Sequence, residues 1–179
     1  MAADSNSSRA PDLPDAAAAS VAALCMQLAE VLLREKIKLA TAESCTGGLI
    51  AAACTDLSGS SAWFERGFVS YSNHAKADML GVDVGLIERH GAVSEEVARA
   101  MARGAVAYSR AQIAVAVTGL AGPTGGSKDK PVGTVWFGWN IRGQLYSEMQ
   151  HFDGDRAAVR AATVGHALRQ LLKHLGQAS

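Results

Sequence analysis

Cysteine is scarce in this sequence. The 179 residues include only Cys25, Cys45 and Cys54, an odd number with no C-x-x-C spacing. Such a set excludes the disulfide framework of small secreted domains, and it favours a reducing, cytoplasmic compartment. The five histidines form no H-x-x-x-H pair. The sequence therefore predicts no metal site.

An excess of charge of either sign is also missing. Lys plus Arg and Asp plus Glu both number 17, which gives a formal net charge of zero. A neutral chain has no general attraction for nucleic acid or anionic lipid, so we expect neither as a direct partner. The most apolar stretch, "DAAAASVAALCMQLAEVLL", is interrupted by Gln27 and Glu30 and has no basic region before it. This argues against an export signal or a membrane span.

What the sequence does contain is enough apolar material for one domain. Hydrophobic residues make up 49% of the chain, and the mean hydropathy is +0.08. Residues 1–14, "MAADSNSSRAPDLP", are polar and contain two prolines, so they are predicted to form a disordered tail. We expect residues 15–179 to fold as a single domain, because a chain of this length is too short for two.

Helical and strand patterns alternate along that domain. Strands are predicted over 36–42, 66–72, 112–119, 132–140 and 144–152, and helices over 15–34, 47–57, 73–81, from Ser94 onward and at the C-terminus. Asn73 and Ser94 are the expected N-caps of two of these helices. The last two strands are predicted to form a hairpin across Arg142 and Gly143. Alternation followed by a late hairpin predicts a three-layer α/β/α sandwich with a mixed, mostly parallel sheet.

The stretch "TAESCTGG", residues 41–48, lies between a predicted strand and a predicted helix. In open α/β sheets, ligands bind beyond the carboxyl ends of the strands. Glycines allow close approach to the backbone, and free N–H groups at a helix start attract negative charge. The stretch could hold a phosphate, or the oxyanion formed when Ser44 attacks a carbonyl. The alternatives are that Cys45 or Thr46 attacks instead, or that Ser44 or Thr46 only caps the helix.

A base for Ser44 could come from "YSNHAKAD", residues 71–78. Tyr71 is placed at a strand end and Lys76 about one turn into the next helix. With the strand-to-helix break at Asn73, both side chains can converge on one site. A lysine acts as a base only when burial or neighbouring cations lower its pKa. The alternative is that Lys76 is an exposed helix lysine.

Two later segments are candidates for ligand binding. "TGLAGPTGGSKDKP" is a long Gly-rich loop after an apolar strand, and such loops are often functional, although a flexible crossover is the alternative. "GDRAAVR" places Arg156 and Arg160 in the first two turns of a helix, where the helix dipole disfavours cations. A bound phosphate or an acidic neighbour would explain these arginines, as would a surface salt bridge.

Five blocks of the sequence together resemble the CinA C-terminal domain family, whose stand-alone members include nicotinamide-nucleotide amidases. The blocks run in the family's order from about residue 20 to 174: "TAESCTGGLIAA", "SGSSAWFERGFVSYSNHAKADMLGV", "HGAVSEEVA", "VTGLAGPTGGSKDKPVGTVWFGW" and "FDGDRAAVR". The chain resembles the short, single-domain form of the family.

The resemblance implies an α/β/α fold and hydrolysis of nicotinamide mononucleotide to nicotinate mononucleotide and ammonia, without a metal or an organic cofactor. It implies that Ser44 is the nucleophile and that Tyr71 and Lys76 assist it. The oxyanion would then be held by N–H groups near Thr46, Gly47 and Gly48. For ribose and phosphate, the candidates are the second glycine loop and an arginine: Gly119, Gly122, Gly125, Gly126 and Arg156.

Some relatives are linked to competence and recombination. The alternative function is therefore a non-catalytic module that binds a nucleotide or a recombination partner. In either case we expect a homo-oligomer, with a dimer as one form.

Overall fold

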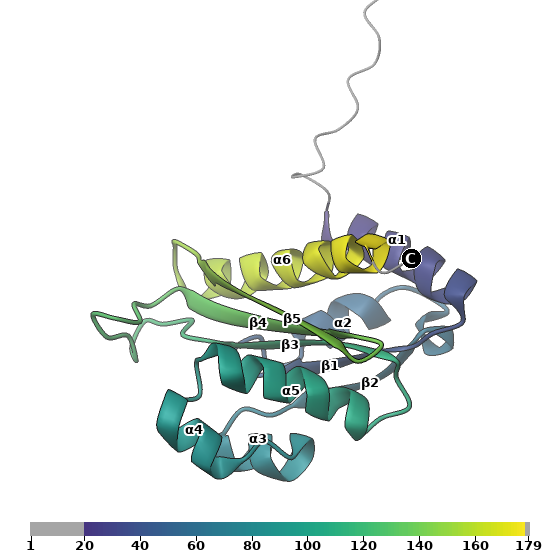
Figure 1. The fold of residues 1–179 in the computed structure, drawn as a ribbon. Coiled ribbons are helices and arrows are strands. Elements are labelled where there is room, and N and C mark those ends of the chain that lie inside the picture. The colour runs from purple at the N-terminus through teal and green to yellow at the C-terminus, as the bar shows by residue number, and fades with distance from the viewer. Residues whose placement is uncertain (1–19, 178–179) are drawn as a thin grey trace, which may run out of the picture.

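A computed structural model describes residues 20–177 (Figure 1). Five strands form one sheet in the order β2-β1-β3-β4-β5. Their bounds are β1 (Leu39–Glu43), β2 (Phe64–Val69), β3 (Ile113–Gly119), β4 (Thr134–Ile141) and β5 (Gln144–His151). β1 pairs in parallel with β2 and β3, and the pairs β3–β4 and β4–β5 are antiparallel. Four strands thus run in one direction and β4 runs against them, which confirms the predicted mixed sheet and the hairpin.

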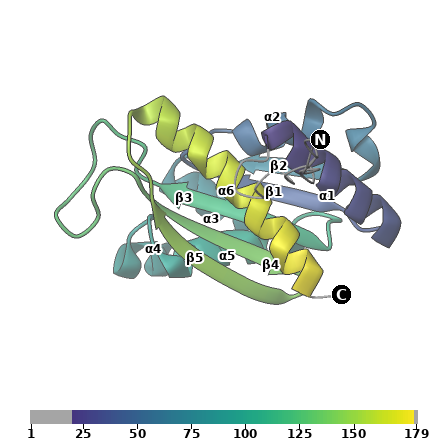
Figure 2. The same cartoon turned by 90° about the horizontal axis from the view of Figure 1, so that it is seen from above.

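Helices cover both faces of the sheet and make the three predicted layers (Figure 1). One face carries α1 (Val21–Glu35), α2 (Leu49–Thr55) and α6 (Arg156–Gln177). The other face carries α3 (Asn73–Leu80), α4 (Val84–His90) and α5 (Glu95–Ala107). Figure 2 shows α6 lying across the sheet beside α1. The predicted tail, residues 1–14, lies outside the described residues, as do residues 15–19 of the first predicted helix.

The central strand β3 explains why the two faces pack differently. Its larger side chains, Ile113, Val115 and Val117, belong to the core under α1 and α6. Its two alanines, Ala114 and Ala116, belong to the core under α5. Side chains on successive residues of a strand point to opposite faces, so the large and the small side chains of β3 are separated. The small ones let α5 approach the sheet closely. The almost uninterrupted apolar run predicted for this strand is buried along its length, except at its last residue.

Two helix starts test the predicted caps. Ser94 caps α5 as expected: its Oγ accepts a hydrogen bond from the Val97 N–H at 3.4 Å. The cap of α3 is Ser72 rather than Asn73, since Ser72 Oγ accepts from the Ala75 N–H at 3.0 Å. Asn73 is instead the first residue of the helix. The prediction was one residue late, because a serine and an asparagine are both good caps and stand next to each other.

Gly104 of α5 lies where the backbone at the end of α3 leaves no room for a side chain. A Cβ atom at this position would lie 2.0 Å from the carbonyl oxygen of Leu80. We expect Gly104→Ala to lower the free energy of unfolding by about 1–3 kcal/mol, the usual cost of overpacking. Gly165→Ala in α6 is the matched control, because the nearest atom to its Cβ would be 4.0 Å away. It should stabilise by about 0.5–1 kcal/mol through helix propensity. Urea unfolding of both variants measures this, and a Gly104→Ala protein as stable as the control contradicts the close packing.

Candidate active site

The site forms where β1 and its two parallel neighbours end. The N–H of Ser44, the first residue beyond β1, donates to the carbonyl of Val117 in β3 at 3.1 Å. On the other side, the N–H of Ser70 donates to the carbonyl of Glu43 at 2.9 Å. The carboxyl ends of the parallel strands therefore meet at one edge of the sheet, as the binding rule for open α/β sheets requires.

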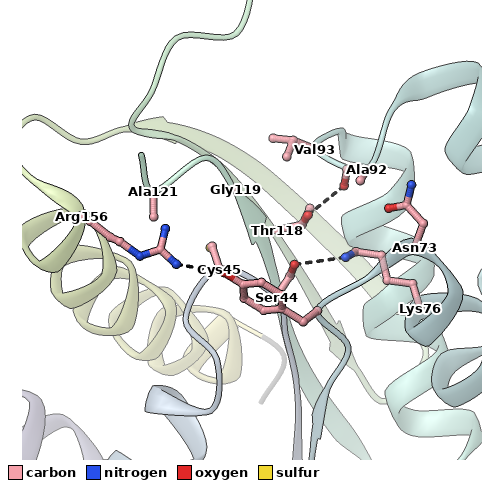
Figure 3. A pocket seen from close by; sticks show the side chains of 11 residues that line it. Ser44, Cys45, Asn73, Lys76, Ala92, Val93, Thr118, Gly119, Ala121 and Arg156 are labelled. Carbon is pink, nitrogen blue, oxygen red and sulfur yellow. Dashed lines mark hydrogen bonds between the residues drawn. The ribbon is translucent and has the colours of Figure 1, made fainter. Parts of the chain in front are cut away.

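Lys76 reaches this edge from α3 and meets the serine (Figure 3). Its Nζ lies 3.1 Å from Ser44 Oγ and 3.1 Å from the carbonyl oxygen of Ser70. Only 1% of the lysine surface is exposed. Burial away from water lowers the pKa of the Lys76 amine. Both hydrogen-bond partners are neutral oxygens, so no carboxylate among them restores the charged form. A lysine in this state can accept a proton.

A cavity of about 220 Å³ lies beside the two side chains. Its walls come from the ends of β1 and β3, from the start of α3, from the segment before α5 and from the start of α6. The residues that line it are Ser44, Cys45, Tyr71, Asn73, Lys76, Ala92, Val93, Thr118, Gly119, Ala121 and Arg156. Thr118 supports one wall, because its Oγ1 donates to the carbonyl of Ala92 at 2.8 Å. Ser44, Tyr71 and Lys76, which the sequence predicted together, thus line the same cavity.

The two other candidate nucleophiles are less suited to attack. Burial raises the pKa of the Cys45 thiol to about 11, so the thiol keeps its proton near neutral pH. The hydroxyl of Thr46 is fully buried and donates to Glu43 Oε2 at 2.7 Å. Ser44 alone of the three has its reactive atom beside the Lys76 amine. The geometry therefore favours the serine.

Glu43 organises the turn and was missed in the sequence as a site residue. Its carboxylate is buried and accepts hydrogen bonds from the N–H groups of Gly48, Ile50 and Ala51 at 3.1, 3.0 and 2.8 Å. A carboxylate is favoured at a helix N-terminus, because the free N–H groups there carry partial positive charge. An acidic residue just before a glycine-rich helix start was the available signal.

The three predicted oxyanion donors differ in their present partners. The Gly47 N–H donates to the Ser44 carbonyl at 3.0 Å, and the Gly48 N–H donates to Glu43. Both glycines have a positive φ, +60° and +100°, which is the backbone conformation the turn requires. The Thr46 N–H acts to lower the pKa of the Cys45 thiol, and it donates no hydrogen bond among the described contacts. Of the three predicted donors, it is therefore the one that remains available.

Arg156 and Tyr71 line the cavity and are both exposed to solvent. One guanidinium nitrogen of Arg156 donates to Tyr71 Oη at 2.9 Å, and another donates to the carbonyl of Gly122 at 2.8 Å. Tyr71 is 58% exposed. The predicted assistance of Tyr71 stays a prediction, since its hydroxyl is bound to the arginine rather than to Ser44 or Lys76 among the described contacts.

The Gly-rich loop reaches the cavity only at its beginning. Gly119 lines the cavity. Gly122 does not line it, but its carbonyl accepts a hydrogen bond from Arg156, which does. Gly125 and Gly126 are not among the lining residues of this cavity. Farther along the loop, Lys130 Nζ donates to the carbonyls of His90 and Val93 at 3.1 and 2.9 Å. This lysine fastens the loop to the segment that forms the opposite wall.

Within residues 20–177, no group of three or more His, Cys, Asp or Glu side chains could hold a metal ion. No helix in this range is long and apolar enough to cross a membrane.

A serine beside a buried lysine, at the carboxyl edge of an α/β sheet, is an arrangement that serine hydrolases use. Comparison with known proteins gives the family. The model of the CinA C-terminal domain matches residues 21–175, so the chain belongs to the CinA C-terminal domain family.

Individual relatives cover most of the chain. The chain is 54% identical over 153 residues to the nicotinamide-nucleotide amidohydrolase PncC of Pseudomonas putida, which covers 86% of this chain and 96% of the relative. It is 51% identical over 149 residues to the PncC of Escherichia coli K12, with 83% and 90% covered. The crystal structure of the competence damage-inducible protein A from Klebsiella pneumoniae superposes with a TM-score of 0.86 at 40% identity, covering 88% of this chain and 98% of that one.

The choice of nucleophile can be tested without a substrate. An aryl sulfonyl fluoride should modify Ser44 in the native protein, because the Lys76 amine can take the serine proton. Cys45→Ala should be modified at the wild-type rate, since the thiol with a pKa of about 11 takes no part. Ser44→Ala should not be modified at this turn. Intact-protein and peptide mass spectrometry give the site and the rate, and modification at Cys45 would overturn the assignment.

Proposed function

We propose that this protein is a nicotinamide-nucleotide amidase, which hydrolyses nicotinamide mononucleotide to nicotinate mononucleotide and ammonia in the cytoplasm. The observation that carries the proposal is the 3.1 Å approach of Lys76 Nζ to Ser44 Oγ at a cavity wall. The names of the PncC relatives supply the substrate class. Three free cysteines among the described residues agree with a reducing compartment.

The first half of the reaction forms an acyl-enzyme. The neutral Lys76 amine takes the proton of the Ser44 hydroxyl as Oγ attacks the carboxamide carbon. The negative charge that develops on the carboxamide oxygen is stabilised by backbone N–H groups of the turn, among which Thr46 is the available donor. The Lys76 ammonium then returns the proton to the leaving nitrogen, and ammonia departs.

The second half regenerates the serine. Water enters beside Ser44, and the Lys76 amine takes one of its protons as the oxygen attacks the acyl carbon. Collapse of the second tetrahedral intermediate breaks the ester bond, and the proton returns to Ser44 Oγ. Nicotinate mononucleotide leaves. Both halves use the same amine, so its depressed pKa serves both proton transfers.

The phosphate of the substrate fits best near Arg156. Its two hydrogen-bond partners, the Tyr71 hydroxyl and the Gly122 carbonyl, are both neutral, so its positive charge is not compensated by them. The cavity of about 220 Å³ suits the pyridine ring better than a whole nucleotide. The ribose and phosphate would then extend toward Arg156 and the exposed Tyr71.

A direct assay tests the function. Purified protein incubated with nicotinamide mononucleotide should release ammonia, and kcat/KM should be far higher than for free nicotinamide, which has no phosphate for Arg156. Arg156→Gln should raise KM for the nucleotide by about tenfold, the loss expected for one charge-assisted contact of about 1.4 kcal/mol. No ammonia above a heat-inactivated control would overturn the proposal. Equal kcat/KM for both compounds would remove the phosphate site.

Lys76→Met tests the base. The substitution keeps the aliphatic stem and deletes the amine, so turnover should be lost in a folded protein. In the wild type, kcat/KM should rise with pH and level off below pH 10.5, because burial lowers the lysine pKa from that ordinary value. A fully active Lys76→Met protein removes the lysine from the mechanism.

The same lowered pKa affects stability, with a definite sign. Below the ordinary lysine pKa the unfolded chain binds a proton that the native amine binds less readily, so the wild type loses stability as the pH falls toward the native pKa. Lys76→Met has no such group. Its melting temperature relative to the wild type should therefore rise as the pH is lowered through this window, and a constant difference would contradict the depressed pKa.

A further inference from the structure

Arg160 contacts the turn that follows β1, residues 44–48, which we call the nucleophile turn. It lies in the second turn of α6, and its Nε donates to the carbonyl of Cys45 at 3.1 Å. Its Nη2 donates to the carbonyl of Thr46 at 2.9 Å. The sequence predicted a phosphate, an acidic neighbour or a surface salt bridge for this arginine. The structure gives it two consecutive backbone carbonyls instead.

These two bonds fix the orientation of a peptide group that matters for the chemistry. A peptide bond is planar and trans, so the carbonyl of Cys45 and the N–H of Thr46 lie in one plane and point in opposite directions. Arg160 holds the carbonyl on the α6 side. The Thr46 N–H consequently points away from the Arg160 guanidinium, and the peptide that carries it directly follows the cavity-lining residues Ser44 and Cys45.

Glu43 holds the same turn from within. It binds the Thr46 hydroxyl and the N–H groups at the start of α2, while Arg160 binds the carbonyls before them. The Glu43 carboxylate thus accepts hydrogen bonds from hydroxyl and N–H donors of the turn, and the Arg160 guanidinium donates to two of its carbonyls. Without the guanidinium, the Cys45–Thr46 peptide would keep its hydroxyl anchor but lose the bond that orients its carbonyl.

We propose that Arg160 is a positioning residue for amide hydrolysis: by binding the carbonyls of Cys45 and Thr46, it aims the Thr46 N–H at the oxyanion. The inference rests on the proposed amidase function. It also explains a cation near the start of α6, where the helix dipole disfavours positive charge, since the arginine satisfies two carbonyls of another segment.

Two substitutions separate orientation from charge. Arg160→Gln removes the charge and the paired donors. Arg160→Lys keeps the charge, but an ammonium group does not reproduce the planar fork that reaches two carbonyls. If orientation matters, Lys should rescue only part of the loss. Arg99→Gln is the matched control, because Arg99 is also a helix arginine that binds another element, donating to Ser147 Oγ at 3.0 Å, and it does not line the cavity.

The first measurement is kcat and KM for nicotinamide mononucleotide. Loss of one oxyanion donor typically lowers kcat by about 10²–10³-fold. Since Arg160→Gln misdirects the donor without deleting it, we expect kcat to fall by about 10–100-fold with KM within about threefold of the wild type. Arg160→Lys should lie between, and Arg99→Gln should match the wild type.

The second measurement uses the thioamide analogue of the substrate. Sulfur is a weaker hydrogen-bond acceptor than oxygen, so a well-aimed N–H favours the amide over the thioamide. The rate with the amide divided by the rate with the thioamide should therefore fall in Arg160→Gln and stay unchanged in Arg99→Gln. General damage to the fold would slow both substrates alike and leave the ratio as it is. Melting temperatures recorded in parallel identify variants that fail to fold.

A third measurement keeps the inference separate from the proposed substrate. Acylation of Ser44 by p-nitrophenyl nicotinate passes through an oxyanion without needing the nucleotide, and release of p-nitrophenol reports its rate. If the wild type releases no ammonia, the amidase proposal is overturned. If the Arg160→Gln variant is nevertheless acylated more slowly than the wild type, the positioning role is supported. Unchanged acylation and kcat in a folded Arg160→Gln protein, or full rescue by lysine, would overturn the positioning role.

Discussion

The site depends on one buried amine. Lys76 is withdrawn from water, and its hydrogen-bond partners among residues 20–177 are two neutral oxygens, Ser44 Oγ and the Ser70 carbonyl. Burial disfavours the charged form of such an amine, so the neutral form, which a general base requires, is more readily available. The rest of the architecture makes this arrangement possible: parallel strands end side by side, α3 begins after a three-residue connection from β2, and the turn after β1 presents the serine.

The sequence predicted this arrangement because its signals are local. A strand, a glycine-rich turn and a helix follow one another around Ser44, and Lys76 follows the next strand by a few residues. The resemblance to a known family added the chemical roles. Local apolar patterns likewise predicted the sheet, including the nearly uninterrupted apolar run that forms the buried strand β3.

The remaining contacts could not be predicted because they are long-range or depend on side-chain geometry. Arg160 is separated by more than 100 residues from the carbonyls it binds, and backbone carbonyls leave no pattern in a sequence. Glu43 stood in the motif, yet its role appears only when the turn brings three N–H groups around one carboxylate. Gly47 and Gly48 were predicted as oxyanion donors, whereas the structure gives their N–H groups other partners. The expected homo-oligomer stays a prediction.

The contact between Arg160 and the nucleophile turn also sets an order of events during synthesis. The serine, the lysine and most of the cavity wall belong to the first 121 residues, but the guanidinium that fastens the turn is added near the end. α6 must leave the ribosome and dock against the sheet before that peptide is fixed. A nascent chain can therefore contain Ser44 and Lys76 while the turn after β1 still lacks its bonds to Arg160.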